Sequence, residues 1–366
     1  MALTIDDVRS ALSEVQDPEL RRPITELGMV DSVVVDDSMV RARILLTITG
    51  CPAADTIERR VRDALNSVSE GRQIDVEIDV MTPEQRAGLI TMLTKDRPRG
   101  NPFTPESLTR VIAVTSGKGG VGKSSITANL AVSVAQAGFS VGIIDADVFG
   151  FSIPGLMGLD GVSPTRIDDL MVPPVAHEVK VLSIGMFVKP DQAVAWRGPL
   201  LHRTIEQFLT DAYFGDLDFL FLDLPPGTGD IALSVGQLLP QADVLVITTP
   251  QPAASEVAWR SAEVARQTGQ QVLGVVENMS AALLPDGSTL DVFGHGGGEA
   301  TATRLGAPLL GSIPLSPSLR EAGDQGIPLV VSHPGDAAAR VLADIAQTIT
   351  QRTESLAGKK LPLRQR

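Results

Sequence analysis

The amino-acid sequence predicts an α/β protein in which a doubly wound domain with a mostly parallel sheet follows a small α+β domain. Its 366 residues correspond to two or three domains at roughly 100 to 200 residues each, and 43% of them are hydrophobic, which is ample for buried cores. From residue 108 onward the chain contains short, continuous apolar runs, as expected for strands buried on both faces. Helical segments lie between several of these runs, as crossover helices do around a parallel sheet.

The small α+β domain is expected over residues 1–94. Thr4 and Asp7 have the spacing of a capping box, and apolar residues at helical spacing follow, so a first helix is expected there. Pro18 ends this helix. The further elements expected from alternation and helical period are strands at 29–35, 39–49 and 74–80, a helix at 54–68 and a short helix after Thr82.

A linker is expected over residues 95–107, because proline, glycine and charged residues concentrate there and the segment has few apolar side chains to bury. The large domain is expected over 108–352, closed by an amphipathic helix at 335–351 and followed by a disordered tail at 353–366. Continuous apolar runs predict its strands at 111–114, 141–144, 179–184, 219–222, 244–247 and 272–276. Helical segments are expected at 124–137, 200–209, 231–239 and 255–268.

Composition narrows the classes of partner and compartment. Lys and Arg number 31 against 44 for Asp and Glu, a formal charge of −13, which disfavours nucleic acid and anionic lipid as partners. The first residues are acidic and no run approaches the roughly 18 apolar residues of a membrane span, so a cytoplasmic protein without a membrane partner is expected. Cys51 is the single cysteine, which excludes a disulfide within the chain and any two-cysteine metal motif.

A glycine-rich motif directly follows the predicted strand at 111–114. It satisfies the pattern G-x-x-x-x-G-K-[ST] in the strand-to-helix setting that this pattern requires. Glycines let backbone amides surround a phosphate, Lys123 supplies a point charge, and the Ser124 hydroxyl is a magnesium ligand. The nucleoside triphosphate site is therefore predicted at Gly117, Lys118, Gly119, Gly120, Val121, Gly122, Lys123 and Ser124.

Acidic residues follow two of the predicted strands. Asp145 and Asp147 come after the strand at 141–144, and Asp223 comes after the strand at 219–222. The carboxyl ends of parallel strands form the ligand-binding edge of such a sheet, so these carboxylates are expected near magnesium, with Asp223 holding it through water. In the loop that follows, the Gly227 amide is expected to sense the terminal phosphate, and Asp230 to cap the next helix.

The stretch GKGGVGKS, together with DADVFG at 145–150 and DLPPGTGD at 223–230, resembles the deviant Walker A ATPases, which include MinD, ParA and the nitrogenase iron protein. WRGP at 196–199, ENMS at 277–280 and FGHGGG at 293–298 narrow the resemblance to the Mrp/ApbC iron-sulfur cluster carriers. This resemblance implies that the ATPase works as a homodimer. Lys118 would reach the partner's phosphates across an ATP-sandwich dimer, a role that suits a cation stabilising phosphoryl charge in trans.

The same resemblance implies roles for other residues of the large domain. Asp147 would orient the attacking water and Asn278 would contact the adenine, while Asp145 and Asp223 would organise magnesium. A phosphoryl transferase acting on a small acceptor with the same loop is a further alternative, although Lys118 and the strand-end aspartates favour hydrolysis.

The amino-terminal domain is similar to the small domain fused to many Mrp proteins and found in other iron-sulfur assembly factors, through residues 15–20, 27–30 and 49–52. Cys51 would open the helix at 54–68. The positive end of the helix dipole would favour its thiolate, which is a soft metal ligand. Burial of Cys51 as a small apolar side chain is the alternative.

The chain departs from the carriers at the segment that follows residue 280. The resemblance implies a Cys-x-x-Cys pair there, whereas residues 281–290 contain no cysteine and offer poor ligands for a cluster. Two functions stay open. The first is a magnesium-dependent ATPase that assembles or transfers iron-sulfur clusters with client apoproteins or assembly factors, Cys51 or a partner supplying thiolates. The second is a metal-free interaction or scaffold ATPase similar to MinD or ParA.

Overall fold

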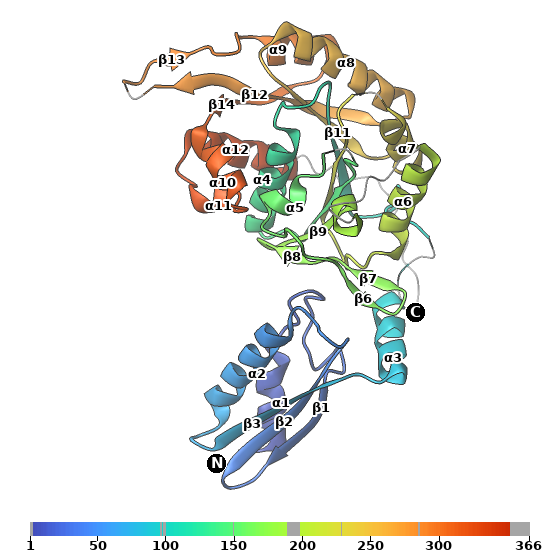
Figure 1. Cartoon of the computed structure of the whole chain (residues 1–366), viewed down its shortest axis with the longest axis vertical. Helices are drawn as coiled ribbons and strands as arrows, with labels where there is room; N and C mark the ends of the chain where they lie inside the picture. The colour runs from blue at the N-terminus through green and yellow to red at the C-terminus, as the bar shows by residue number, and fades with distance from the viewer. Residues whose placement is uncertain are drawn as a thin grey trace.

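The computed structural model describes residues 3–351 except 96, 98–99, 149, 189–197, 228 and 285. The tail predicted at 353–366, and Trp196 and Arg197 of the family motif, lie outside the described residues. Figure 1 shows a small unit at the amino terminus, in blue, and a larger unit formed by the rest of the chain. The two units are connected through α3 (Pro83–Thr94).

The small unit is a sheet with helices packed on it. The capping box of Thr4 and Asp7 starts α1, as predicted. β1 and β2 are antiparallel, β2 and β3 are parallel, and the order is β1-β2-β3. The buried faces of the two helices, which include Leu12 and Val61, join the sheet in one apolar cluster. The elements are α1 (Ile5–Ser13), β1 (Val30–Val35), β2 (Met39–Leu46), α2 (Ala54–Val68) and β3 (Gln73–Val80).

The large unit is built on a mostly parallel sheet of order β13-β12-β11-β4-β10-β5-β9-β8, with β14 paired to β12. Its central strands are buried along their whole length, which is why their sequences show no alternation. The prediction of an α/β fold with a largely parallel sheet and a small additional domain is confirmed. The strands are β4 (Arg110–Ser116), β5 (Val141–Asp145), β8 (Val175–Ala176), β9 (Val179–Ser183), β10 (Phe219–Asp223), β11 (Asp243–Thr248), β12 (Gln271–Leu283), β13 (Thr289–Leu290) and β14 (Leu309–Leu315).

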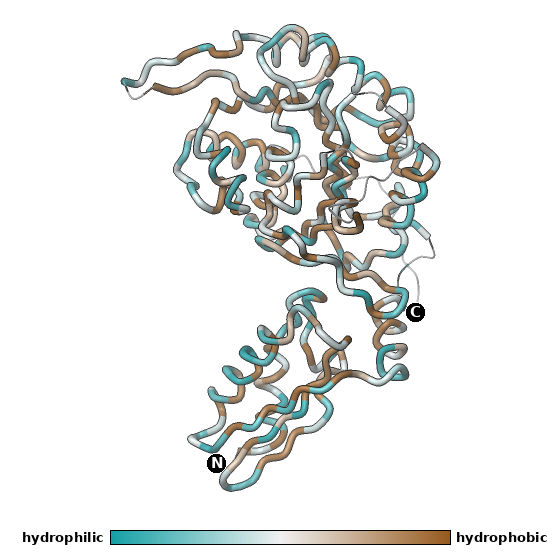
Figure 2. Tube along the Cα trace, in the orientation of Figure 1, coloured by the Kyte–Doolittle hydropathy of each residue, from teal (hydrophilic) through white to brown (hydrophobic). Residues whose placement is uncertain are grey.

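Helices cover both faces of this sheet. Ile112 and Val114 of β4 pack in a cluster with α4 and α12, whereas Val111 and Ala113 pack in a second cluster with α6, α7, α8 and α9. Figure 2 shows that hydrophobic residues concentrate along the central strands. The helices are α4 (Lys123–Gln136), α5 (Ile153–Leu156), α6 (Gly198–Asp211), α7 (Asp230–Leu238), α8 (Pro252–Gln267), α9 (Gly297–Leu305), α10 (Pro317–Asp324), α11 (Leu329–Ser332) and α12 (Ala337–Gln351).

Several elements differ from the sequence predictions. β12 continues to Leu283, beyond the predicted strand at 272–276, and with β13 it forms an arm that projects from the body (Figure 1). The arm is exposed at Leu283, Leu284 and Leu290, so it lacks the buried run that identified the other strands. The short strands β6 (Thr165–Ile167) and β7 (Leu170–Val172), the 3-10 turn η1 (Ile184–Phe187) and β14 were not predicted either.

The segment predicted as a linker has contacts with the large unit. Arg97 Nη2 donates a hydrogen bond of 2.8 Å to the carbonyl of Thr210, and Asn101 Nδ2 donates one of 3.1 Å to that of Leu238. The Phe103 side chain is buried and meets the Phe214 ring edge to face. One buried aromatic ring and two backbone-directed hydrogen bonds thus hold the segment against the large unit, and its role as a linker stays a prediction. Within the part of the chain that the structure describes, no helix combines the length and apolarity that crossing a membrane requires.

Candidate functional site

The glycine-rich loop connects the end of β4 at Ser116 to the start of α4 at Lys123, in the predicted strand–loop–helix arrangement. Gly120 and Gly122 have φ of +75° and +82°, a region that favours glycine. A Cβ at Gly122 would also lie 2.3 Å from Asn278 Nδ2, and one at Gly117 would lie 2.2 Å from the backbone nitrogen of Ala258. Glycine is therefore required for conformation at Gly120, for packing at Gly117, and for both at Gly122.

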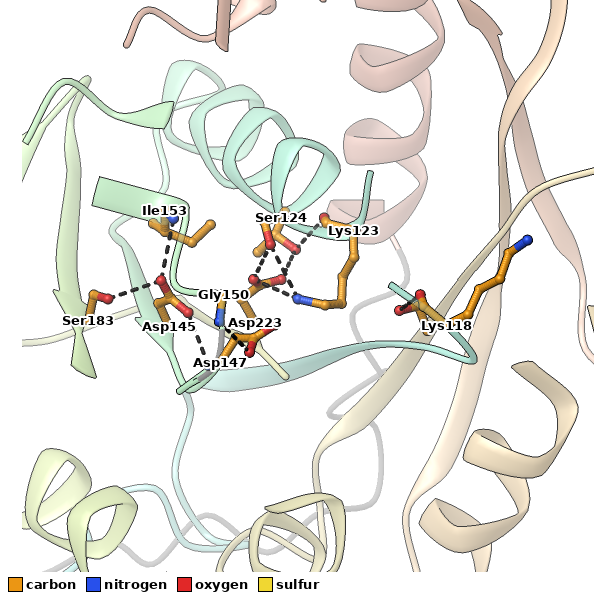
Figure 3. A network of polar contacts seen from close by, with 11 residues as sticks. Lys118, Lys123, Ser124, Asp145, Asp147, Gly150, Ile153, Ser183 and Asp223 are labelled. Carbon is orange, nitrogen blue, oxygen red and sulfur yellow. Dashed lines mark hydrogen bonds and ion pairs between the residues drawn. The ribbon is translucent and has the colours of Figure 1, made fainter. Parts of the chain in front are cut away.

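A buried network joins the loop to Asp223 at the end of β10 (Figure 3). Lys123 Nζ lies 2.7 Å from Asp223 Oδ2, and the two side chains are 6% and 0% exposed. The Ser124 hydroxyl donates a 2.5 Å hydrogen bond to the same oxygen, while Thr127 Oγ1 donates one of 2.9 Å to Oδ1. The predicted proximity of Asp223 to Lys123 and Ser124 is present. Thr127, one helical turn after Lys123, was missed, although its spacing on the helix is the signal that points to it.

Asp145 lies behind this network and is fully buried. Its Oδ1 accepts from the backbone amide of Asp147 at 3.1 Å, and its Oδ2 accepts from Ser183 Oγ at 3.0 Å and from the amide of Ile153 at 3.3 Å (Figure 3). Burial, and then the neighbouring carboxylate of Asp223, raise the pKa of Asp145 to about 8. Its oxygens are directed at protein donors, so in this arrangement Asp145 fixes the loop that carries Asp147.

A cavity of about 600 Å³ opens along the loop, and Asp147 lines it together with Lys118, Lys123 and Ser124. Asp147 Oδ1 accepts a hydrogen bond of 3.1 Å from the Gly150 amide. The size falls in the range of small-molecule sites. The structure therefore brings the predicted triphosphate-binding residues from Lys118 to Ser124 and the predicted water-orienting carboxylate to one cavity.

A second cavity, of about 550 Å³, shares Gly122 and Ser125 with the first. Asn278 and Met279 of β12 line it, together with Arg320 of α10. Asn278 is buried, and its Nδ2 donates a 2.9 Å hydrogen bond to the carbonyl of Val121 in the loop. Asn278 therefore sits at the junction of the two cavities, and its predicted contact with adenine stays a prediction.

Lys118 is placed differently from Lys123. Its Nζ donates a 2.5 Å hydrogen bond to Gln251 Oε1 at the start of α8. Figure 3 shows the Lys118 side chain extending away from Lys123 and Asp223. The two lysines of the motif thus lie in different surroundings: Lys123 is inside the buried network, and Lys118 is at the rim of the cavity.

The loop after Asp223 is tied to the same region. The Gly227 amide donates a 2.8 Å hydrogen bond to the carbonyl of Ser116, and Ser261 Oγ donates one of 3.2 Å to the Gly227 carbonyl. Asp230 was expected to cap the following helix, but α7 begins at Asp230 and Gly229 is its N-cap residue. The sensing role of Gly227 stays a prediction.

Cys51 lies apart from this site, in the apolar core of the small unit, and is 7% exposed. Burial raises the pKa of its thiol to about 11, and the carboxylates of Glu19 and Asp17 act in the same direction. The expected stabilisation of the thiolate was therefore wrong. The helix α2 starts at Ala54 as predicted, but burial of the thiol is the largest effect on its pKa. Among the described residues, no group of three or more His, Cys, Asp or Glu is arranged to hold a metal ion.

Replacing Thr127 by valine should weaken nucleotide binding without removing any predicted phosphate contact. The change leaves Asp223 Oδ1 without its 2.9 Å donor, and an unmet buried acceptor costs about 1–3 kcal/mol. Misplacement of Asp223 should then raise the dissociation constant for magnesium and ATP by about tenfold, measured by calorimetry. Thr91→Val, which removes an exposed helix hydroxyl from α3, is the matched control. Unchanged affinity in Thr127→Val would show that Asp223 needs no support from Thr127.

Comparison with known proteins identifies both units. Residues 107–350 match the family model described as NUBPL iron-transfer P-loop NTPase, and residues 5–78 match that of an iron-sulfur cluster assembly protein. The iron-sulfur cluster carrier protein of Mycobacterium tuberculosis H37Rv is 52% identical over 365 residues, covering 97% of this chain and 96% of the relative. That of Bacillus subtilis is 36% identical and covers 85% and 88% of the two chains.

Solved structures resemble the large unit. A nucleotide-binding protein of Archaeoglobus fulgidus, in complex with ADP, is 35% identical with a TM-score of 0.54, covering 64% of this chain and 96% of that one. The cell division ATPase MinD of Pyrococcus furiosus is 25% identical with a TM-score of 0.51, covering 67% and 99%. The family predicted from the glycine-rich loop and its accompanying motifs is confirmed. The chain belongs to the iron-sulfur cluster carrier protein family, whose large unit is a P-loop NTPase related to MinD and ParA.

Proposed function

We propose that this chain binds ATP with Mg²⁺, hydrolyses ATP as a homodimer, and acts in the assembly or transfer of iron-sulfur clusters to client proteins. The observation that carries the nucleotide part is the network in which Lys123, Ser124 and Thr127 converge on Asp223 beside a cavity of about 600 Å³. The proposed role with iron-sulfur clusters is supported by two family matches: the large unit matches an iron-transfer P-loop NTPase, and the small unit matches an iron-sulfur cluster assembly protein.

The donors around Asp223 fit Mg²⁺ and a triphosphate. Ser124 and Asp223 offer a hydroxyl and a carboxylate, the hard oxygen ligands that Mg²⁺ prefers directly or through water. When bound, Mg²⁺ would neutralise charge on the phosphates. Lys123 would exchange its pairing with Asp223 for the phosphate oxygens, while the loop amides hold the remaining charge. Asp147 would hold the attacking water at the mouth of the same cavity.

Hydrolysis by one subunit alone would lack a further cation. Lys118 is the cation of the loop that stays outside the network, held by Gln251 at the rim of the cavity. A second copy brought to this rim would receive Lys118 at its phosphates, where a positive charge stabilises the transferring phosphoryl group. ATP turnover would then depend on the concentration of the protein.

The iron-sulfur cluster would be cargo of the protein, because the chain offers few ligands for it. One cysteine per chain gives a dimer two thiols, and each is buried with its pKa raised. A four-iron cluster prefers four thiolates. Thiolates from a client, an assembly factor or a small thiol would complete the ligand set. The absence of a Cys-x-x-Cys pair also supports the metal-free alternative, a nucleotide-dependent scaffold of the MinD or ParA kind.

The isolated protein should therefore not keep a cluster. After anaerobic reconstitution and desalting, iron, sulfide and visible absorption should fall to background, because at least two ligand places would be left to water or carboxylate. An added thiol or a client apoprotein should restore the absorption, and Cys51→Ala should lose it again. A stoichiometric four-iron cluster that survives desalting without thiol, or survives Cys51→Ala, would contradict this assignment of ligands.

Transfer to a client separates the two proposed functions. A thiol-supported cluster on the protein, mixed with an apo four-iron acceptor enzyme, should activate the acceptor faster with ATP and Mg²⁺ than without, and Lys123→Ala should remove the difference. A metal-free scaffold would hydrolyse ATP normally and activate no acceptor under any of these conditions.

A further inference from the structure

The two units meet at a polar joint between the loop that follows α1 and the segment from β6 to β9. Glu19 Oε1 accepts a hydrogen bond of 2.8 Å from Thr165 Oγ1 of β6. Arg21 forms an ion pair with Glu178, in the turn before β9. Around these contacts, Ile167 and Val172 belong to the same apolar cluster as the core of the small unit. The polar joint consists of Asp17, Glu19 and Arg21 from the small unit and Thr165, Glu178 and Lys180 from the large unit.

Two charged groups of the joint are deeply buried. Asp17 and Lys180 are 3% and 4% exposed, and Lys180 Nζ donates a 2.9 Å hydrogen bond to the carbonyl of Phe214. Burial lowers the pKa of Lys180 to about 8, against the opposing effect of Asp17 and Glu19, and burial raises the pKa of Glu19 to about 7. For buried groups of opposite charge, the free energy lost by removing them from water nearly cancels the free energy gained from their mutual attraction. The polar half of the joint therefore contributes little net stability and can separate at low cost.

The thiol of Cys51 lies on the small-unit side of this joint. It belongs to the apolar cluster that contains Ile167 and Val172 of the large unit, and the carboxylates of Glu19 and Asp17 add to the effect of burial in raising its pKa. Separation of the loop at Asp17 and Glu19 from the large unit would therefore bring water to the neighbourhood of Cys51.

Strand β9 connects the joint to the nucleotide site. It is five residues long and fully buried, with Lys180 near its start and Ser183 at its end. β9 pairs with β5 so that Lys180 lies opposite Gly142 and Ser183 lies opposite Asp145. Ser183 Oγ donates to Asp145 Oδ2, and Asp145 in turn holds the amide of Asp147 at the cavity. One rigid strand thus ends in the site and begins in the joint.

We propose that β9 couples the two regions, so that Mg²⁺ and ATP at the glycine-rich loop open the polar joint and uncover Cys51. When a triphosphate binds Lys123, the ion pair between Lys123 and Asp223 is lost, and the charge beside Asp145 changes. This change would reach β9 because Ser183 Oγ donates a hydrogen bond to Asp145. The coupling rests on the proposed nucleotide-binding function, and it adds that nucleotide binding controls the exposure of Cys51. It makes a thiol that could contribute to cluster transfer available only in the nucleotide-bound protein.

The single cysteine makes the test specific. The full-length protein is treated with 5,5′-dithiobis(2-nitrobenzoic acid), which releases a coloured thiolate when it reacts with a thiol. Because Cys51 is the single cysteine, the absorbance reports the reaction of Cys51 alone. Nucleotide occupancy is measured in the same samples with a fluorescent ATP analogue. Mg²⁺ with a non-hydrolysable ATP analogue should raise the reaction rate by about tenfold, within the usual range of coupling between sites.

Variants at the polar joint and at Ser183, the end of β9 nearest the site, test the joint and the link separately. Thr165→Val removes the donor to Glu19 and should give the fast rate without nucleotide, whereas Thr165→Ser keeps the hydroxyl and should react slowly. Glu19→Gln, which removes the carboxylate with little change of shape, should also be fast. Ser183→Ala should bind nucleotide yet show no acceleration, because its contact with Asp145 is lost. Arg41→Gln, at an exposed ion pair of the small unit, is the control and should match the wild type.

The outcomes distinguish the coupling from the function beneath it. A rate that stays unchanged while the nucleotide is bound would overturn the coupling alone, and so would full acceleration in Ser183→Ala. Slow reaction in both Thr165→Val and Glu19→Gln would show that the joint does not cover Cys51. Absence of nucleotide binding by the wild type would overturn the proposed function itself, and the coupling with it.

Discussion

Lys123→Ala is expected to give no measurable heat of ATP binding. Lys123 is the buried cation of the loop, and charge-assisted hydrogen bonds contribute about 1.5–3 kcal/mol each, so losing those to the phosphates lowers affinity by roughly a hundredfold or more. The substitution also leaves Asp223 without its cation in a fully buried position. Removing one partner of such a pair costs about 3–5 kcal/mol, so the melting temperature should fall as well.

Lys123→Arg separates these two effects. The arginine keeps a positive charge near Asp223 and should keep most of the thermal stability, but its planar group does not fit a loop shaped for a compact ammonium. Binding should therefore stay weak while folding recovers. Lys95→Ala, at the end of α3, serves as the matched control. Near wild-type ATP affinity in a folded Lys123→Ala protein would show that the loop is not the phosphate site.

Lys118→Ala should have its effect on turnover. Because Lys118 bonds to Gln251 at the rim and not to the Asp223 network, binding of ATP should change by no more than about threefold. Turnover should fall by roughly a hundredfold or more, since a cation supplied in trans to a transferring phosphoryl group contributes on the order of 10³–10⁵ in related enzymes. Steady-state hydrolysis and calorimetry on the same samples give the two numbers.

Arg260→Ala is the control for Lys118→Ala, because it removes an exposed cation of α8 that pairs with Glu256. Its turnover should equal that of the wild type. If Lys118→Ala weakened binding as much as turnover, the lysine would be serving the nucleotide of its own subunit.

The parts of the fold that the sequence predicts well are those with one dominant physical signal. Strands such as β10 (Phe219–Asp223) are apolar throughout because both faces are covered, and that pattern has no competing explanation. β14 contains Gly311, Ser312 and Pro314, which interrupt its apolar run. The arm of β12 and β13 is exposed, so burial leaves no periodic trace in its residues.

The same distinction applies to the site. The glycine-rich loop and the strand-end aspartates are identified by local spacing, which is why the sequence brings Lys123, Ser124 and Asp223 together correctly. Ser183 and Gln251 are recruited from distant segments, and nothing local separates them from other polar residues. For Cys51 the local signal, a helix amino terminus, gave the wrong direction because burial is a property of the tertiary structure.

Mixed dimers test the sharing of the active site between two subunits. Lys118→Ala lacks the cation given to the partner, and Asp147→Asn lacks the carboxylate that would hold water in its own subunit. Each variant alone should be nearly inactive. In verified mixed dimers, one composite site keeps both groups if Lys118 acts in trans and Asp147 in cis, so ATP hydrolysis should recover to about half of the wild-type rate per dimer. Mixed dimers that form but hydrolyse no more ATP than the two variants alone would contradict the shared site.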